Sequence, residues 1–108
     1  MSADCIFCKI INGTIPAKKI YEDVDFVVFH DIKPIARVHF LIVPKLHVET
    51  LKDCNEAHQQ LLGKALLLAP VLAAEQGLVG FKTLINTGRE GGQEVFHLHA
   101  HIFGDSSL

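Results

Sequence analysis

The sequence predicts an α+β domain in which helices cover one side of an antiparallel sheet. Short runs rich in β-branched and aromatic residues follow one another with tight turns between them, as expected for adjacent antiparallel strands. One long stretch instead repeats its apolar residues at helical spacing. Short strands joined by turns, together with a separate long helix, are typical of the α+β class.

The individual elements follow in order along the chain. Asp4 is a suitable N-cap for a short first helix, and Gly13 can end that helix. Asn55 can cap the long helix and Gly77 can end it, while Pro70 inside it should cause a kink or the loss of one hydrogen bond. The predicted elements are a helix over residues 5–11, strands over 19–22, 26–30 and 38–43, a helix over 55–76, and strands over 81–86 and 95–103.

Length and composition limit the class of protein. The chain has 108 residues, which suits a single domain over 1–108. It is 49% hydrophobic with a formal net charge of −2, a combination that excludes intrinsic disorder. Because 10 Lys and Arg are outnumbered by 12 Asp and Glu, we expect no nucleic-acid partner. No apolar run approaches the ~20 residues of a membrane span, so we expect no membrane partner either.

The three cysteines are Cys5, Cys8 and Cys54. The N-terminal residues contain no basic region followed by an apolar stretch, so no export signal is expected. An odd cysteine count in such a chain argues against a disulfide framework and for a reducing compartment, and we therefore expect a cytoplasmic protein. Cys5 and Cys8 form a C-x-x-C pair, which by itself fits half a zinc site, a redox pair or a coincidence.

Three histidines near the C-terminus alternate with apolar residues. In a strand, His97, His99 and His101 would point to one face at intervals of about 7 Å, with the apolar row on the other face. Two chemistries use aligned imidazoles. One is metal binding. The other is phosphoryl transfer, in which a neutral imidazole attacks phosphorus while neighbouring N–H groups stabilise the phosphoryl charge.

The loop before these histidines favours the phosphoryl interpretation. Gly91 and Gly92 allow main-chain N–H groups to approach an anion closely, and Gln93 adds a neutral donor beside them. The alternative is a plain turn at the head of a strand.

The histidine motif and several segments before it closely resemble the histidine triad family. The signature of that family is His-φ-His-φ-His-φ-φ with φ hydrophobic, and residues 97–103 match it in full as His-Leu-His-Ala-His-Ile-Phe. Cys-Ile-Phe-Cys-Lys-Ile-Ile at 5–11 resembles the opening helix of the family. Segments 29–34 and 39–45 are similar to the branch of nucleotide-binding proteins that cleave nucleoside phosphoramidates. The resemblance covers most of the chain.

This resemblance implies a fold and an activity. The fold is a five-stranded antiparallel sheet with two helices, and two copies form a homodimer with a continuous ten-stranded sheet. The activity is hydrolysis of the P–N bond of purine nucleoside 5′-phosphoramidates, such as AMP–amine or aminoacyl-AMP conjugates, with no cofactor required for catalysis. His99 would attack the α-phosphorus and form a nucleotidyl-histidine. His101 would hold the phosphate or orient the leaving group, while His97 completes the triad and His39 is the supporting fourth histidine.

The resemblance also implies the residues that contact the nucleotide. Asp31 would accept hydrogen bonds from the ribose hydroxyls, and Asn86 would line the phosphate site. Core packing explains the apolar members of the set equally well. The expected nucleotide-binding residues are Phe7, Ile10, Ile15, Phe29, Asp31, Ile32, Asn86, Gly92, Gln93, Glu94, Val95, His99 and His101.

Two departures from the family pattern bear on the leaving group. Where several relatives have a serine, this chain has Glu94, which has no proton to give in its ionised form. The chain also stops soon after Gly104, where relatives often carry a longer tail that shapes substrate preference.

The resemblance also implies a role for the C-x-x-C pair. Some family members bind structural zinc through two such cysteines and two histidines, which correspond here to Cys5, Cys8, His47 and His97. Other members lack the cysteines and keep the fold. The alternative is a pair of buried thiols on a short helix.

Three other functions stay open from the sequence. The first is a nucleotide-binding interaction or regulatory module with weak catalysis. The second is a dinucleoside polyphosphate hydrolase of the same family. The third is a zinc hydrolase that uses the histidines as catalytic ligands.

Overall fold

A five-stranded antiparallel sheet forms the centre of the protein. The computed structural model describes residues 5–105. The strands are β1 (Lys19–Glu22), β2 (Phe26–His30), β3 (Val38–Pro44), β4 (Lys82–Leu84) and β5 (Ala100–Gly104). They lie in the order β1-β2-β3-β5-β4, and every neighbouring pair is antiparallel. The predicted five-stranded antiparallel sheet with two helices is therefore confirmed.

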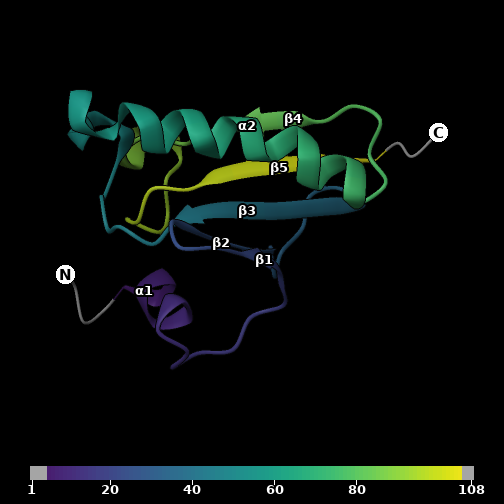
Figure 1. Cartoon of the computed structure of the whole chain (residues 1–108), viewed down its shortest axis with the longest axis horizontal. Coiled ribbons are helices and arrows are strands. Elements are labelled where there is room, and N and C mark those ends of the chain that lie inside the picture. The colour runs from purple at the N-terminus through teal and green to yellow at the C-terminus, as the bar shows by residue number, and fades with distance from the viewer. Residues whose placement is uncertain (1–4, 106–108) are drawn as a thin grey trace.

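The two helices, α1 (Ile6–Ile11) and α2 (Gln59–Glu75), lie on opposite faces of this sheet (Figure 1). α2 packs against the face that carries Phe40 and Ile102, whereas α1 packs against the face that carries Phe29 and Leu41. The prediction that helices cover one side only is wrong. The reason is that β3 is buried along its whole length, so both of its faces need cover.

The ends of the helices differ slightly from the predictions. The N-cap of α1 is Cys5, whose sulfur accepts a hydrogen bond from the N–H of Cys8 at 3.1 Å. The predicted cap, Asp4, lies outside the described residues. Asn55 caps a 3₁₀ turn (Glu56–His58) that precedes α2, so the α-helix itself begins later than predicted.

α2 ends at Glu75, one residue before the predicted bound, and continues through its proline. Gly77 adopts φ +86 just after the helix, a conformation that strongly favours glycine. Pro70 lies on the exposed side, and the helix continues on both sides of it. Among residues 5–105, no helix is both long enough and apolar enough to cross a bilayer.

The fifth strand is shorter than predicted, and this changes how the histidines are held. β5 begins at Ala100, so His97 and His99 precede it. β3 ends at Pro44, which has no N–H to offer to a ladder. Instead of strand pairing, the N–H of Leu98 donates to the carbonyl of Val48 at 2.7 Å. The predicted strand over 81–86 is also shortened, to the three residues of β4.

Candidate functional site

The three histidines lie together on the α1 face of the sheet, although only His101 belongs to a strand. The ring centroids of His99 and His101 are 4.9 Å apart. Phe7 of α1 packs edge-on against His99, with centroids 5.0 Å apart, and also against His97 at 6.0 Å. The apolar residues between them, Leu98 and Ala100, are buried. All three imidazoles therefore lie on one face, as the alternation in the sequence predicted.

His99 is oriented by a main-chain carbonyl. Its Nδ1 lies 2.7 Å from the carbonyl oxygen of His97, so Nδ1 carries the proton and donates it. This tautomer leaves a lone pair on Nε2. Burial lowers the pKa of His99, and the ring is therefore neutral near pH 7. A neutral imidazole with a free Nε2 can act as a nucleophile.

His39 and His101 form a hydrogen-bonded pair beside His99. Nε2 of His39 lies 2.9 Å from Nδ1 of His101. Burial lowers the pKa of His39. Burial, followed by the neighbouring His99 and His39, lowers the pKa of His101 to about 4. Both rings are therefore neutral near pH 7, and the pair can offer hydrogen bonds without a net charge.

Asp31 stands next to this pair. Its Oδ2 is 3.4 Å from Nε2 of His39 and 3.8 Å from Nδ1 of His101, while its Oδ1 accepts a hydrogen bond from the N–H of Lys33 at 2.8 Å. The three side chains are close enough to hold a metal ion. However, the direct hydrogen bond between the two imidazoles already occupies the ring nitrogens that such an ion would need.

The glycine-rich loop ends in a left-handed turn. Gly92 has φ +90 after the 3₁₀ turn Arg89–Gly91, so glycine is favoured at that position. Asn86 lies against it, because a Cβ added to Gly92 would be 3.7 Å from the Asn86 side chain. The structure thus brings together two of the residues predicted to line the phosphate site.

Gln93 braces the loop and is not a free donor. Its Oε1 accepts from the N–H of Gly88 at 2.9 Å. Its Nε2 donates to the carbonyls of Glu49 at 2.7 Å and Val95 at 3.0 Å. Both amide hydrogens are therefore used within the protein, so the predicted donor role of the Gln93 side chain towards a phosphate would require one of these two hydrogen bonds to break.

The other predicted nucleotide-binding residues divide into three groups. Phe7, Ile10 and Phe29 are buried in the core between α1 and the sheet, and Ile15 packs against this core. Ile32 is 90% exposed, so it does not line a closed pocket with them. Glu94 and Val95 line a cavity of about 270 Å³, together with Cys5, Ile6, His47, Glu49 and Phe96.

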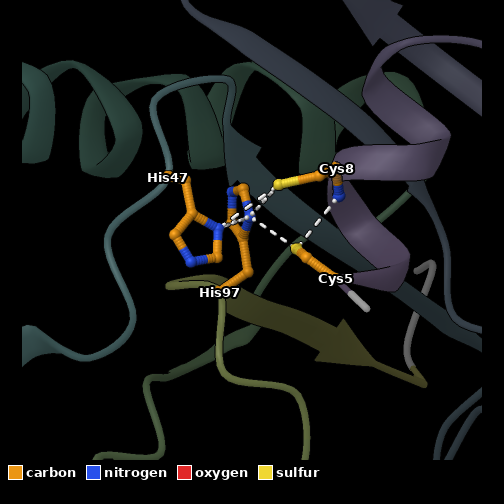
Figure 2. A group of neighbouring side chains, drawn as sticks. All are labelled: Cys5, Cys8, His47 and His97. Atoms are coloured by element: carbon orange, nitrogen blue, oxygen red, sulfur yellow. Dashed lines mark hydrogen bonds between the residues drawn. The ribbon is translucent and has the colours of Figure 1, made fainter. Parts of the chain in front are cut away.

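Cys5, Cys8, His47 and His97 converge on one point (Figure 2). Their donor atoms all lie within 4.8 Å of one another. Sγ of Cys5 is 3.3 Å from Nδ1 of His97, and Sγ of Cys8 is 3.3 Å from Nδ1 of His47. The two Nδ1 atoms are 3.0 Å apart. These residues come from α1 and its N-cap, the loop after β3 and the segment before β5, so only the tertiary structure assembles the cluster.

The chemistry of this cluster fits a zinc ion. Nε2 of His97 donates to the carbonyl of Pro44 at 2.7 Å, so its Nδ1 presents a lone pair to the cluster. Tetrahedral zinc would space its sulfur and nitrogen ligands by roughly 3.3–3.8 Å, close to the separations found here. Burial and then Cys5 raise the pKa of Cys8 to about 11, which means that two thiolates here need a cation to balance them.

Sequence reasoning missed two main-chain groups that orient the histidines. The carbonyl of Pro44 fixes the tautomer of His97, and the N–H of Ile35 donates to Nδ1 of His39 at 3.2 Å. No pattern of residue types marks such groups, because every residue except proline carries both a donor and an acceptor on its main chain.

Comparisons with known proteins agree with this fold. The family model described as "Scavenger mRNA decapping enzyme C-term binding" matches residues 4–108. "Protein HitA" of Neisseria gonorrhoeae is 55% identical over 102 residues, covering 94% of this chain and 95% of that protein. "Purine nucleoside phosphoramidase" of Escherichia coli K12 is 38% identical over 110 residues, covering 100% of this chain and 92% of that protein.

Solved structures give the same result. A histidine triad protein from Clostridium difficile superimposes with a TM-score of 0.93 at 41% identity, covering 100% of this chain and 96% of that one. A HIT family hydrolase from Legionella pneumophila gives a TM-score of 0.92 at 42% identity, with coverage of 95% and 94%. The fold and the clustered histidines are those of a histidine triad protein. The chain therefore belongs to the histidine triad (HIT) family.

Proposed function

We propose that this protein hydrolyses the P–N bond of purine nucleoside 5′-phosphoramidates through a covalent nucleotidyl-histidine at His99. The observation that carries the proposal is the 2.7 Å hydrogen bond from Nδ1 of His99 to the carbonyl of His97, which leaves Nε2 free to attack. The name of the Escherichia coli relative, "Purine nucleoside phosphoramidase", supports the choice of substrate.

The proposed reaction has two steps. In the first, the lone pair on Nε2 of His99 forms a bond to the α-phosphorus, the P–N bond breaks with its electron pair going to nitrogen, and the amine leaves with a proton supplied by the solvent. In the second, water attacks the same phosphorus and gives up a proton to the solvent, the bond to Nε2 breaks with its electron pair returning to Nε2, and the nucleoside monophosphate is released. N–H groups close to the phosphoryl oxygens would stabilise the charge that develops in both transition states.

A comparison of leaving groups tests this proposal. Adenosine and guanosine 5′-phosphoramidates are expected to be hydrolysed with a kcat/KM at least roughly 100-fold above that of dinucleoside polyphosphates with the same bases. The measurement is steady-state release of AMP or GMP. Faster cleavage of the polyphosphates would identify a polyphosphate hydrolase instead. Binding of AMP in calorimetry without turnover of any phosphoramidate would identify a binding module.

We also propose that Cys5, Cys8, His47 and His97 hold a structural Zn²⁺. The convergence of two sulfur and two nitrogen donor atoms supports this assignment. With four protein ligands, the ion would have no open position for substrate, so its contribution would be to stability and not to bond making. His97 would link the ion to the nucleophile, because its main-chain carbonyl accepts the hydrogen bond from His99.

A homodimer is the third part of the proposal. β4 is an edge strand whose three residues are all exposed. α2 leaves Leu66, Leu67 and Val71 49%, 74% and 54% exposed. An unpaired edge and an uncovered apolar helix face are the features that a second copy of the chain would cover.

Charge on that helix face is expected to separate the dimer. Light scattering should give twice the chain mass for the wild type and the chain mass for the Leu67→Lys, Val71→Lys double variant, because lysine resists burial in an interface. Val24 is 85% exposed in the turn between β1 and β2, and β1 is the edge strand opposite β4, so Val24→Lys provides the control and is expected to stay dimeric. A wild type that runs as a monomer at micromolar concentration would refute the dimer.

A further inference from the structure

A chain of three hydrogen-bonding groups runs from the loop after β2 to the catalytic face. It begins at the main-chain N–H of Ile35, which donates to Nδ1 of His39 at 3.2 Å. It continues from Nε2 of His39 to Nδ1 of His101 at 2.9 Å. His101 lies next to the proposed nucleophile, with its ring centroid 4.9 Å from that of His99.

Only one arrangement of protons satisfies this chain when the rings are neutral. A main-chain N–H can only donate, so Nδ1 of His39 must present a lone pair. The single ring proton of His39 is therefore on Nε2 and points at Nδ1 of His101. That nitrogen must then be an acceptor, which places the ring proton of His101 on its Nε2. The opposite order would set a donor against the N–H of Ile35.

Asp31 reinforces the same proton positions. Its Oδ2 is 3.4 Å from Nε2 of His39, so it is a second acceptor for the proton already assigned there. It is 3.8 Å from Nδ1 of His101, too far to draw a proton to that nitrogen. Asp31 and the N–H of Ile35 therefore favour the same two tautomers.

The geometry points to the main-chain N–H of Ile35 as a positioning group that fixes both His39 and His101 as Nε2–H tautomers. His101 thereby presents a permanent N–H donor on the side of its ring away from His39. In the proposed reaction, on which this consequence rests, that donor would serve the phosphoryl oxygens or the departing amine. His99 and His101 thus have complementary roles. His99 offers a lone pair on its Nε2, and His101 offers a proton on its Nε2. A main-chain group sets the tautomer of each ring.

The loop that carries Ile35 is anchored at both ends, and this holds its main-chain N–H in a fixed position relative to His39. The N–H of Asp31 donates to the carbonyl of His39 at 3.0 Å. At the other end, Arg37 bonds to Asp105 through its N–H at 2.8 Å and its Nε at 2.9 Å. The side chain of Ile35 is 69% exposed, so the position contributes its main chain and not its side chain.

The test combines one pair of variants with a spectroscopic measurement of ring protonation. Ile35→Pro removes the N–H, whereas Ile35→Ala keeps it and removes only the exposed side chain. Two-bond ¹H–¹⁵N spectra of histidine-labelled protein near pH 7 report which nitrogen of each ring carries the proton. Wild type and Ile35→Ala are expected to show His39 and His101 as Nε2–H tautomers. Ile35→Pro is expected to show mixed tautomers at both rings.

The rate of phosphoramidate turnover is the second measurement. Loss of one hydrogen bond should shift the tautomer balance, and kcat for the phosphoramidate should fall roughly five- to tenfold in Ile35→Pro with little change in KM. Ile35→Ala should keep the wild-type kcat. Tautomers in Ile35→Pro that match those in Ile35→Ala would overturn the inference.

The wild-type spectrum keeps the inference falsifiable even if Ile35→Pro fails to fold. A proton on Nδ1 of His101 in the wild type overturns it outright. The outcome is also independent of the proposed function. Nε2–H tautomers without phosphoramidate turnover would refute that function and leave the tautomer assignment standing, whereas turnover with the other tautomers would do the reverse.

Discussion

Replacing His99 with asparagine is expected to lower kcat for AMP release by at least roughly 10⁴-fold, the scale seen when a catalytic nucleophile is removed. The amide nitrogen of asparagine can take the position of Nδ1 and keep the hydrogen bond to the carbonyl of His97. No nucleophilic nitrogen then remains at the position of Nε2. The variant should therefore fold and bind AMP while failing to turn over phosphoramidates, as measured by steady-state kinetics and calorimetry.

A matched control separates loss of the nucleophile from loss of a histidine in general. His58 lies in the 3₁₀ turn before α2, where its Nδ1 accepts a hydrogen bond from the N–H of Asn55. His58→Asn keeps an acceptor there and is expected to retain wild-type kcat. In the wild type, rapid quenching at neutral pH should trap a nucleotide adduct that peptide mapping places on His99. An adduct on another side chain, or normal turnover by His99→Asn, would contradict the mechanism.

Loss of the cysteine ligands is expected to have the largest effect on stability. The double variant Cys5→Ser, Cys8→Ser removes both sulfur donors and should abolish the proposed zinc binding. With free zinc a thousandfold above Kd, binding to the folded state contributes about 4 kcal/mol. For a domain of this size that corresponds to a fall in Tm of roughly 16 °C or more. Metal analysis of purified protein and thermal denaturation are the two measurements.

Cys54 provides the matched control for this experiment. Its sulfur lies 3.9 Å from the carbonyl of Thr50 and does not belong to the cluster. Cys54→Ser is therefore expected to keep both the zinc content, one ion per chain, and the wild-type Tm. Wild-type protein that contains no zinc after refolding with the ion, and whose Tm does not respond to it, would show that Cys5 and Cys8 are only buried thiols.

Much of the fold could be predicted because local signals and burial agree along most of the chain. β1 and β2 have the predicted bounds, and Gly77 ends α2 as expected. The shortened β5 was not predictable in the same way. An alternating pattern over 95–103 specifies which side each residue faces, but a strand also needs a partner, and β3 ends at Pro44. The helices on opposite faces have a similar explanation, since the apolar run of β3 demands cover on both sides.

The candidate site shows the same division. The sequence by itself determined the residue types of the site: three alternating imidazoles, a glycine loop and a C-x-x-C pair, because these signals are local and periodic. Only the tertiary structure decided how those groups are protonated and paired. The carbonyl of His97 and the N–H of Ile35 each bond to one imidazole, and the side-chain amide of Gln93 bonds to three main-chain groups. Hydrogen bonds depend on the distance and direction between segments far apart in the chain. The type of a single residue encodes neither quantity.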